Sequence, residues 1–121
     1  MPLVDTSVWV DHLNHGDTAL ASALQDGHVL MHPFVLGEIA LGNLRDRNAV
    51  LGHMAGLPAA LAANEAEVLQ LISRHKLHGI GVGYIDAHLL ASAMLSNVTL
   101  WTRDRRLKAA AEALGLSWGM D

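Results

Sequence analysis

The stretch that decides the fold is Leu3-Val4-Asp5-Thr6-Ser7-Val8-Trp9-Val10, close to the N-terminus. Its first two residues predict a short strand that ends at Asp5, and the hydroxyl residues that follow can cap a helix over residues 7–14. A similar order returns near the C-terminus, where Val98 to Thr102 is rich in β-branched and aromatic residues and predicts a strand. Asp104 comes after it, before a helix predicted over residues 105–114. Each of these strands is therefore followed by an acidic residue and a helix.

The chain between the two stretches alternates between short apolar runs and helical patterns. A strand is predicted over residues 28–31, and residues 57–62 fit either a short buried strand or part of a helix. The predicted helices cover residues 18–25, 33–44, 45–55, 64–79 and 84–96, and a last short strand covers 116–119. This alternation predicts an α/β fold, a three-layer α/β/α sandwich with a short-stranded, mostly parallel sheet. Without a linker or an internal repeat, residues 1–121 are expected to form a single domain.

Composition excludes several classes of protein. The 121 residues are 51% hydrophobic and 17% charged, which excludes intrinsic disorder. The absence of cysteine excludes disulfide scaffolds, thiolate zinc sites and cysteine nucleophiles. The sequence begins without a basic signal region and has no apolar run of membrane-spanning length, so we expect a soluble, cytoplasmic protein without a membrane partner. The formal net charge of −4 excludes a simple cationic coat for nucleic acid.

Four carboxylates stand apart from the other eight acidic residues. Asp5 and Asp104 follow predicted strands, and the carboxyl ends of parallel strands form the ligand crevice of α/β sheets. Glu38 and Asp86 fall on the apolar faces of their predicted helices, where an ionised carboxylate is costly unless it is paired. Each position also has a simpler interpretation. Asp5, Asp86 and Asp104 could cap helices, and Glu38 could reach water at the edge of its face.

If the four carboxylates converge, their charges require compensation. Two carboxylates about 4 Å apart repel each other by roughly 4 kcal/mol at an effective dielectric constant of about 20. Such a cluster needs either protons or a cation, and ligands that are all oxygen suit Mg²⁺ or Mn²⁺. A metal of this kind can activate water for attack on phosphorus and stabilise the leaving oxygen. The chemistry predicted by this pattern is the hydrolysis of a phosphate ester.

The order of these motifs resembles the PIN-domain ribonucleases, and in particular the VapC-type toxins of bacterial toxin–antitoxin pairs. The resemblance covers essentially the whole chain. Its motifs are Asp5-Thr6-Ser7-Val8-Trp9-Val10, Val35-Leu36-Gly37-Glu38-Ile39, Tyr84-Ile85-Asp86-Ala87-His88-Leu89-Leu90-Ala91 and Leu100-Trp101-Thr102-Arg103-Asp104.

The resemblance implies an endoribonuclease that depends on Mg²⁺ or Mn²⁺. Asp5, Glu38, Asp86 and Asp104 match the acidic cluster that is both metal-binding and catalytic in the family. Thr102 matches a hydroxyl residue that helps to position this cluster. The resemblance also implies an RNA substrate, a homodimer or a larger toxin–antitoxin assembly, and a cognate antitoxin whose C-terminal segment covers the acids.

Three features depart from or extend this pattern. Ser7 matches the opening hydroxyl and could either hold a ligand carboxylate or cap its helix. Some relatives carry a further acid after the last Asp, whereas this chain has Arg105 and Arg106 there, which leaves a second metal site in doubt. Arg103 and Arg105 could contact substrate phosphate beside the metal, or form a solvated helix start.

Two other functions compete with the toxin. Another Mg²⁺-dependent phosphohydrolase with an aspartyl nucleophile would need an Asp two residues after Asp5, where the chain has Ser7. A catalytically weak PIN fold that only binds partners would not require the four acids. If these acids form one site, the remaining eight match the eight Lys and Arg residues. The net charge of −4 is then better explained by a cation site than by the absence of a nucleic-acid partner.

Overall fold

A ladder of very short parallel strands lies at the centre of the computed structural model, which describes residues 1–119, so the last two residues of the predicted domain lie outside it. Strand β1 (Leu3–Val4) pairs in parallel with β2 (Leu100–Trp101). Isolated parallel bridges extend this pair on both sides, from Leu3 to Leu30 and Met31 to Ala59, and from Leu100 to Ser117. The segments therefore lie in the order 59, 30–31, 3–4, 100–101 and 117.

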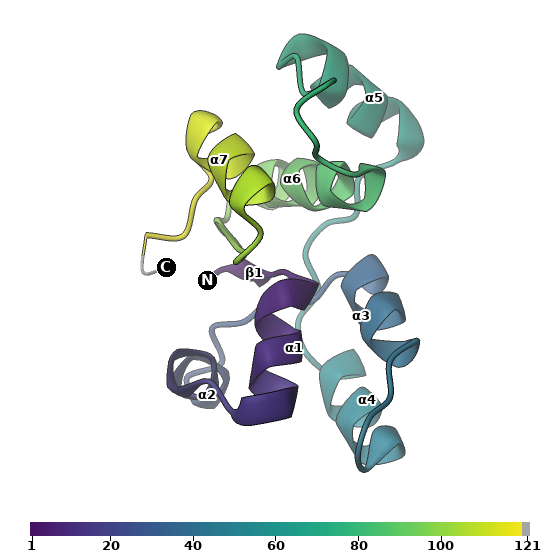
Figure 1. Cartoon of the computed structure of the whole chain (residues 1–121), viewed down its shortest axis with the longest axis vertical. Helices are drawn as coiled ribbons and strands as arrows, with labels where there is room; N and C mark the ends of the chain where they lie inside the picture. Colours follow the sequence, from purple (N-terminus) through teal and green to yellow (C-terminus); the bar gives the residue numbers. More distant parts are fainter. Residues whose placement is uncertain (120–121) are drawn as a thin grey trace.

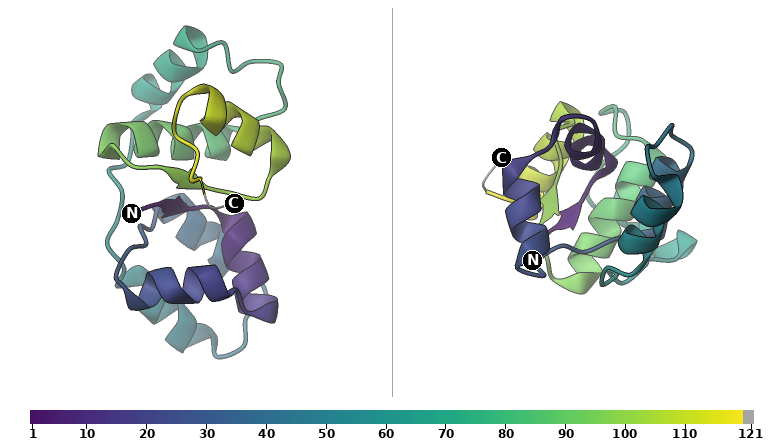
Figure 2. Two further views of the ribbon diagram at one scale, coloured as in Figure 1. Left: turned by 90° about the vertical axis from the view of Figure 1, so that its left-hand side faces the viewer. Right: turned by 90° about the horizontal axis from the view of Figure 1, so that it is seen from below.

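Two groups of helices cover the strands. The helices are α1 (Thr6–His15), α2 (Thr18–Gln25), α3 (Pro33–Ala40), α4 (Arg47–Ala55), α5 (Glu65–Arg74), α6 (Tyr84–Ser96) and α7 (Arg105–Ala113). Strand β1 lies between a group formed by α1 to α4 and a group formed by α5, α6 and α7 (Figure 1), and the side view shows the same division (Figure 2). This arrangement confirms the predicted α/β/α layering. No helix in the described part of the chain is long and apolar enough to span a membrane.

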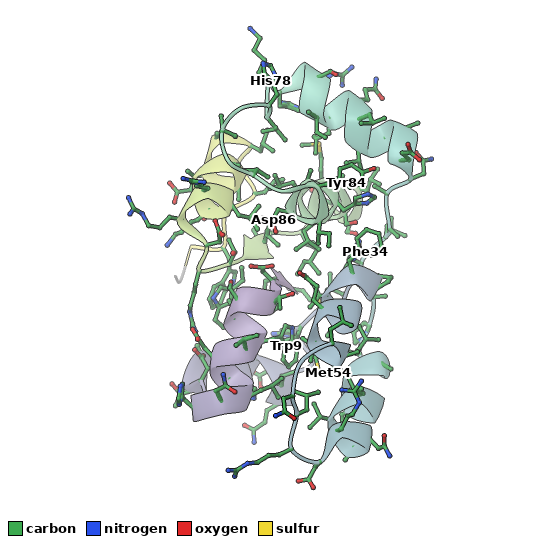
Figure 3. All side chains as sticks on the ribbon, turned by 45° about the vertical axis from the view of Figure 1, so that its right-hand side comes forward. Trp9, Phe34, Met54, His78, Tyr84 and Asp86 are labelled. Atoms are coloured by element: carbon green, nitrogen blue, oxygen red, sulfur yellow. The ribbon has the colours of Figure 1, made fainter. Side chains whose placement is uncertain are left out.

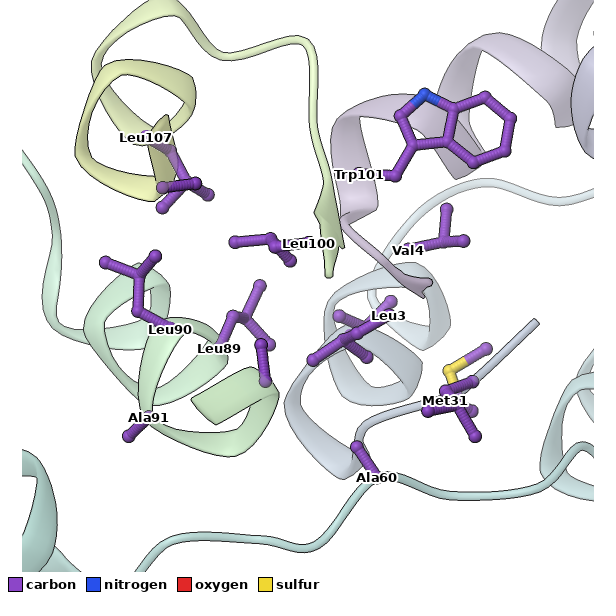
Figure 4. Close-up of a cluster of buried hydrophobic side chains, with 14 of the residues drawn as sticks. Leu3, Val4, Met31, Ala60, Leu89, Leu90, Ala91, Leu100, Trp101 and Leu107 are labelled. Carbon is purple, nitrogen blue, oxygen red and sulfur yellow. The ribbon is translucent and has the colours of Figure 1, made fainter. Parts of the chain in front are cut away.

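The strands are buried on both faces. Leu3 and Val4 are fully buried, as are Leu89 and Leu90 of α6 and Leu107 of α7. Figure 4 shows these side chains with Leu100 and Trp101 around the strand pair. Burying a side chain of this size contributes about 1.5–3 kcal/mol, so this cluster holds α6 and α7 against the strands. The positions of residues that follow each strand are fixed by this packing.

The predicted helices are present, with caps close to those that the sequence indicates. Asn64 and Glu67 form a complete capping box at the start of α5, and Pro33 occupies the first turn of α3. Two helices end earlier than predicted. The helix predicted to reach residue 44 ends at Ala40, and the one predicted to reach residue 79 ends at Arg74.

The strands are shorter than the apolar runs that predicted them. The run 98–102 gives only Leu100–Trp101, and the predicted strands 28–31 and 116–119 contribute only isolated bridges. The prolines supply one reason. Pro2 precedes β1, Pro33 follows the bridge at Met31, and Pro58 precedes the bridge at Ala59. A proline has no N–H to donate, so Pro2 and Pro58 contribute only their carbonyls, which accept from the Leu30 and Met31 N–H groups.

Candidate active site

Asp5 and Asp104 lie beyond the carboxyl ends of two neighbouring strands, β1 and β2. The segment that follows β1 in the chain, residues 30–31, lies on one side of β1, and β2 lies on its other side. Residue 117, which follows β2 in the chain, lies on the side of β2 that faces away from β1. The strand order therefore reverses between β1 and β2. Such a reversal opens the crevice in which parallel α/β sheets bind ligands, because the two following helices diverge.

Asp5 is buried and held by hydroxyl groups. Its Oδ2 accepts hydrogen bonds from Ser7 Oγ at 2.7 Å and Thr102 Oγ1 at 2.7 Å. Oδ2 also accepts a longer bond from the Ser7 backbone N–H at 3.4 Å, which caps α1. Of the two roles predicted for Ser7, its hydroxyl group therefore holds the carboxylate, whereas the cap of α1 is Asp5 and not Ser7. These bonds leave Oδ1 of Asp5 without a hydrogen-bond partner among the described residues.

Ser7 and Thr102 also order the backbone that leads to the second acid. Ser7 Oγ accepts a hydrogen bond from the Arg103 N–H at 3.0 Å, and Thr102 Oγ1 accepts one from the Asp104 N–H at 3.1 Å. The hydroxyl groups of Ser7 and Thr102 lie 3.3 Å apart. The turn after β2 is therefore tied to the start of α1, and Asp104 is placed on the same side of the sheet as Asp5.

Asp104 caps α7. Its Oδ1 accepts hydrogen bonds from the backbone N–H groups of Arg106 and Leu107, both at 3.0 Å. The capping role that the sequence allowed is therefore real. It occupies one oxygen, and Oδ2 has no hydrogen-bond partner within the part of the chain that the structure describes.

Glu38 differs from the prediction, because its side chain is exposed and not on an inward face. The buried stripe of α3 consists of Val35 and Ile39. Glu38 lies beside this stripe and faces α1, where its Oε1 accepts a hydrogen bond from Thr6 Oγ1 at 2.8 Å. The short helix explains the error, since residues such as Leu41, which is 90% exposed, were counted in a longer apolar face.

Asp86 is partly buried in the first turn of α6, and Figure 3 places it near the start of α1. Burial raises the pKa of its carboxyl to about 6, and the negative charges of Asp5, Asp104 and Glu38 add to this effect. A hydrogen bond from the Gly83 backbone acts in the opposite direction. The structure therefore brings the four predicted acids into one electrostatic neighbourhood, although they come from four separate segments.

The chemistry of these side chains fits a divalent cation. All four offer carboxylate oxygens, and the ion pairs formed among the described residues leave them without a basic partner. In three of them one oxygen is anchored by a hydrogen bond, which fixes the carboxylate and leaves its second oxygen for a ligand. Within residues 1–119 no three such side chains converge tightly enough to form a complete metal cage. The acids surround the site, and a cation would draw them together.

Arg103 has acidic partners next to this site. Its Nη1 pairs with Asp11 Oδ2 at 2.8 Å, and its Nη2 pairs with Asp17 Oδ2. The pKa of Asp17 is lowered, first by the hydrogen bond from the Leu20 N–H and then by Arg103. Arg103 thus links the turn after β2 to α1 and to the cap of α2. Arg105 is exposed on the first turn of α7.

A group of aromatic rings beside the acids was not predicted. His88 is buried between Phe34 of α3 and Tyr84 of α6, with ring centroids 4.8 and 4.7 Å away. Phe34 also packs against buried His32, whose pKa falls to about 4 because of burial and, less strongly, the charge of His88. These contacts hold α3 against α6 and so position Glu38 relative to Asp86. Ring contacts between distant segments leave no periodic signal in the sequence.

The fold and the acids at its switch point define a class of protein, and comparison with known families agrees. Residues 3–113 match the model of the PIN domain. The chain therefore belongs to the PIN-domain family.

Within this family the chain is similar to VapC-type proteins. It is 44% identical over 118 residues to Ribonuclease VapC32 of Mycobacterium tuberculosis strains CDC 1551 / Oshkosh and H37Rv, which covers 97% of this chain and 95% of the relative. The fold is similar to FitAcB from Neisseria gonorrhoeae, with a TM-score of 0.65, 25% identity and coverage of 93% and 94% of the two chains. PAE2754 from Pyrobaculum aerophilum has a TM-score of 0.60 at 21% identity, with coverage of 91% and 78%.

Proposed function

We propose that this protein is a metal-dependent endoribonuclease that acts as the toxin of a toxin–antitoxin pair. The observation that carries the proposal is the grouping of Asp5, Glu38, Asp86 and Asp104 at the switch point of the sheet, where three of them raise the pKa of the fourth. The extensive identity to a protein named Ribonuclease VapC32 supports RNA as the substrate.

The four carboxylates are the proposed ligands of Mg²⁺ or Mn²⁺. When bound, the cation would supply the positive charge that activates water and stabilises the leaving oxygen of a phosphodiester. Ser7 and Thr102 serve as positioning residues, because both hold Oδ2 of Asp5 in a fixed direction. Without a cation, burial and the neighbouring carboxylates raise the pKa of Asp86, so a bound cation would favour its ionised form and its role as a ligand.

Arg103 and Arg105 are proposed to contact substrate phosphate. Arg105 follows Asp104 directly and is exposed, which makes it accessible to a strand bound at the acids. Arg103 reaches two carboxylates, so a phosphate would have to share its guanidinium with Asp11 and Asp17. We therefore expect a larger contribution to binding from Arg105.

The proposed partners follow from membership in the VapC-type group. A cognate antitoxin would block cleavage by covering the acids, and two toxin chains would form a homodimer within a larger toxin–antitoxin assembly. We propose that this assembly is cytoplasmic, where the RNA substrate is present.

The function is tested with the purified chain and a mixture of cellular RNAs in the presence of Mg²⁺ or Mn²⁺. We expect new RNA ends with the wild type, and loss of cleavage in Asp5→Asn, in Asp86→Asn and after chelation of the metal. Asp26→Asn is a matched control, because Asp26 is exposed at the end of α2 and outside the acidic group. Undiminished cleavage by Asp5→Asn or Asp86→Asn would contradict the proposal.

A further inference from the structure

A cavity of about 640 Å³ lies between α7 and the chain that connects α5 to α6. Figure 1 shows α7 beside this connection. The apolar lining of the cavity consists of Leu77 and Ile80 of the connection and of three alanines of α7, Ala109, Ala110 and Ala113. Its volume falls within the range of sites that bind small molecules or single groups of a polymer, about 300–1,000 Å³.

The polar lining of this cavity is entirely basic. Lys76, Arg105, Arg106 and His75 contribute to its walls, and no acidic residue does. Three of the eight Lys and Arg residues therefore meet at one place in a chain whose net charge is −4. The described ion pairs do not involve these side chains. Basic groups with like charge repel each other, and an anionic ligand would relieve this repulsion.

The segment between α5 and α6 has a glycine, Gly81, where the Arg106 side chain packs against it. Gly81 has a φ of +83°, and a Cβ added there would lie 2.6 Å from both Cδ and Nη1 of Arg106. The Arg106 side chain therefore lies directly across the face of Gly81, at a distance that only glycine permits. Any side chain at position 81 would displace the guanidinium from this path. The placement of Arg106 thus depends on a specific residue in a different segment.

The cavity adjoins the acidic site at the start of α7, where two of its lining residues follow Asp104. Arg105 and Arg106 directly follow Asp104, and the Arg106 N–H donates to Asp104 Oδ1 at 3.0 Å. A strand bound at the acids that continues along α7 would pass from Asp104 onto these arginines. Phosphate recurs at every nucleotide, so such a strand presents an anion to the cavity regardless of its sequence.

We infer that this cavity is a phosphate-binding subsite for substrate RNA, with Arg106, Arg105 and Lys76 as its cationic contacts and Gly81 as the residue that positions Arg106. The inference rests on the proposed ribonuclease function. It adds a second place at which the RNA backbone is bound, next to the site of cleavage. The acids beside the cavity repel any polyanion. A substrate RNA must nevertheless reach these acids, so it needs a basic site next to them, whereas an acidic protein segment has no such requirement.

The test measures binding of a short unstructured RNA, labelled with a fluorophore, by anisotropy in chelator so that no cleavage occurs. Each phosphate contact with single-stranded RNA adds about 0.7 to the slope of log affinity against log salt. Arg106→Ala is expected to weaken binding about 3- to 10-fold at low salt, and this difference should shrink roughly 2.5-fold when the salt rises about fourfold. In steady-state cleavage the same variant should raise KM and leave kcat at saturating RNA unchanged, since the lost contact binds the substrate and the transition state equally.

A second variant tests the role of Gly81, and two matched controls separate this subsite from general effects. Gly81→Ala should reproduce the loss of salt slope, and combining it with Arg106→Ala should add nothing further. Gly79→Ala imposes a similar backbone strain, with a φ of +74°, but its Cβ would meet no atom within 4 Å, so it should retain the wild-type slope. Arg47→Ala makes the same change of charge on α4, in the other group of helices, and should also retain it. Thermal unfolding establishes that each variant is folded.

The possible outcomes distinguish this inference from the proposed function. Wild-type affinity and slope in Arg106→Ala, or an equal loss in Arg47→Ala, would overturn the subsite even if the wild type cleaves RNA. A wild type that binds RNA through Arg106 but cleaves none with Mg²⁺ or Mn²⁺ would retain the subsite and reject the nuclease. If Arg106→Ala loses binding to poly-glutamate and not to RNA, the cavity serves an acidic protein segment, and the inference is wrong.

Discussion

Replacing Asp86 by Asn should stabilise the metal-free protein at neutral pH. The carboxyl of Asp86 has a pKa of about 6 because it is partly buried and because Asp5, Asp104 and Glu38 are nearby. Its ionised form is therefore less favourable in the folded chain than in the unfolded chain. Asn has a similar shape and no charge, so this cost disappears in the variant.

The size of the effect follows from the pKa and the exposure. A pKa of about 6 in place of the ordinary 3.8 corresponds to about 3 kcal/mol at about 1.36 kcal/mol per pH unit. Solvent screening of this partly exposed carboxyl reduces the cost to about 1.5 kcal/mol. The first turn of α6 favours a negative charge by roughly 0.5 kcal/mol, which the variant loses. The expected gain is about 1 kcal/mol, or about 4 °C in Tm for a domain of this size.

The pH dependence of stability provides an independent test of whether Asp86→Asn stabilises the protein. A carboxyl whose pKa is raised on folding contributes stability that is complete below about pH 4 and is lost as the pH rises through about 6. The wild type and Asp86→Asn should therefore have similar stability at pH 4, and the variant should become the more stable protein between pH 4 and 7. Urea denaturation in chelator, at a series of pH values, measures this difference. The exposed control Asp26→Asn should change stability by less than about 0.5 kcal/mol.

With a divalent metal bound, the wild type should become more stable than Asp86→Asn. Mg²⁺ or Mn²⁺ is expected to raise the Tm of the wild type, because a ligand that binds only the folded state stabilises it. Asp86→Asn lacks one proposed ligand and should gain less. A variant that is less stable than the wild type in chelator at pH 7, or a stability difference that does not change between pH 4 and 7, would refute this account of Asp86.

Three further predictions concern the groups around the acids. Thr102→Val removes a buried hydrogen bond to the Asp5 carboxylate and should cost about 1.5–3 kcal/mol in urea denaturation, whereas Thr102→Ser should recover most of it. Arg103→Ala breaks the pairing with Asp17 and should cost less than about 1 kcal/mol. Because the pKa of Asp17 is lowered, this deficit should be present at neutral pH and vanish as the pH falls below about 4; a deficit that persists at low pH would point to lost packing. RNA cleavage should stop in chelator and return on addition of Mn²⁺, as measured by gel electrophoresis, and cleavage that continues in chelator would exclude a metal-dependent mechanism.

Much of the fold was accessible from local patterns. The cap of α5 by Asn64 and Glu67 involves residues three apart, so the sequence displays it directly. The succession of strand, acid and helix at Asp5 and Asp104 likewise needs only neighbouring residues. The lengths of the strands were not accessible, because each depends on which segment lies alongside and on where a proline interrupts it.

The candidate site, like the fold, was predicted in part from the sequence. Its four acids were predicted from their order along the chain, and the structure brings them close enough for three to affect the pKa of Asp86. The inward orientation of Glu38 was predicted wrongly, because the apolar face was drawn on a helix longer than α3. The pairing of Arg103 with Asp11 and Asp17 and the packing of His88 between Phe34 and Tyr84 join segments far apart in sequence, and neither leaves a local signal.

By itself, the sequence of this protein determined which helices form and which acids are candidates for the chemistry, since caps, apolar periodicity and the positions of acids after strands act over a few residues. Only the tertiary structure decided how these groups meet. The reversal of strand order beside β1 creates the acidic site, and the contact of Arg106 with Gly81 shapes the basic cavity next to it. Both depend on the packing of distant segments, because burial and electrostatic interaction act through space and not along the chain.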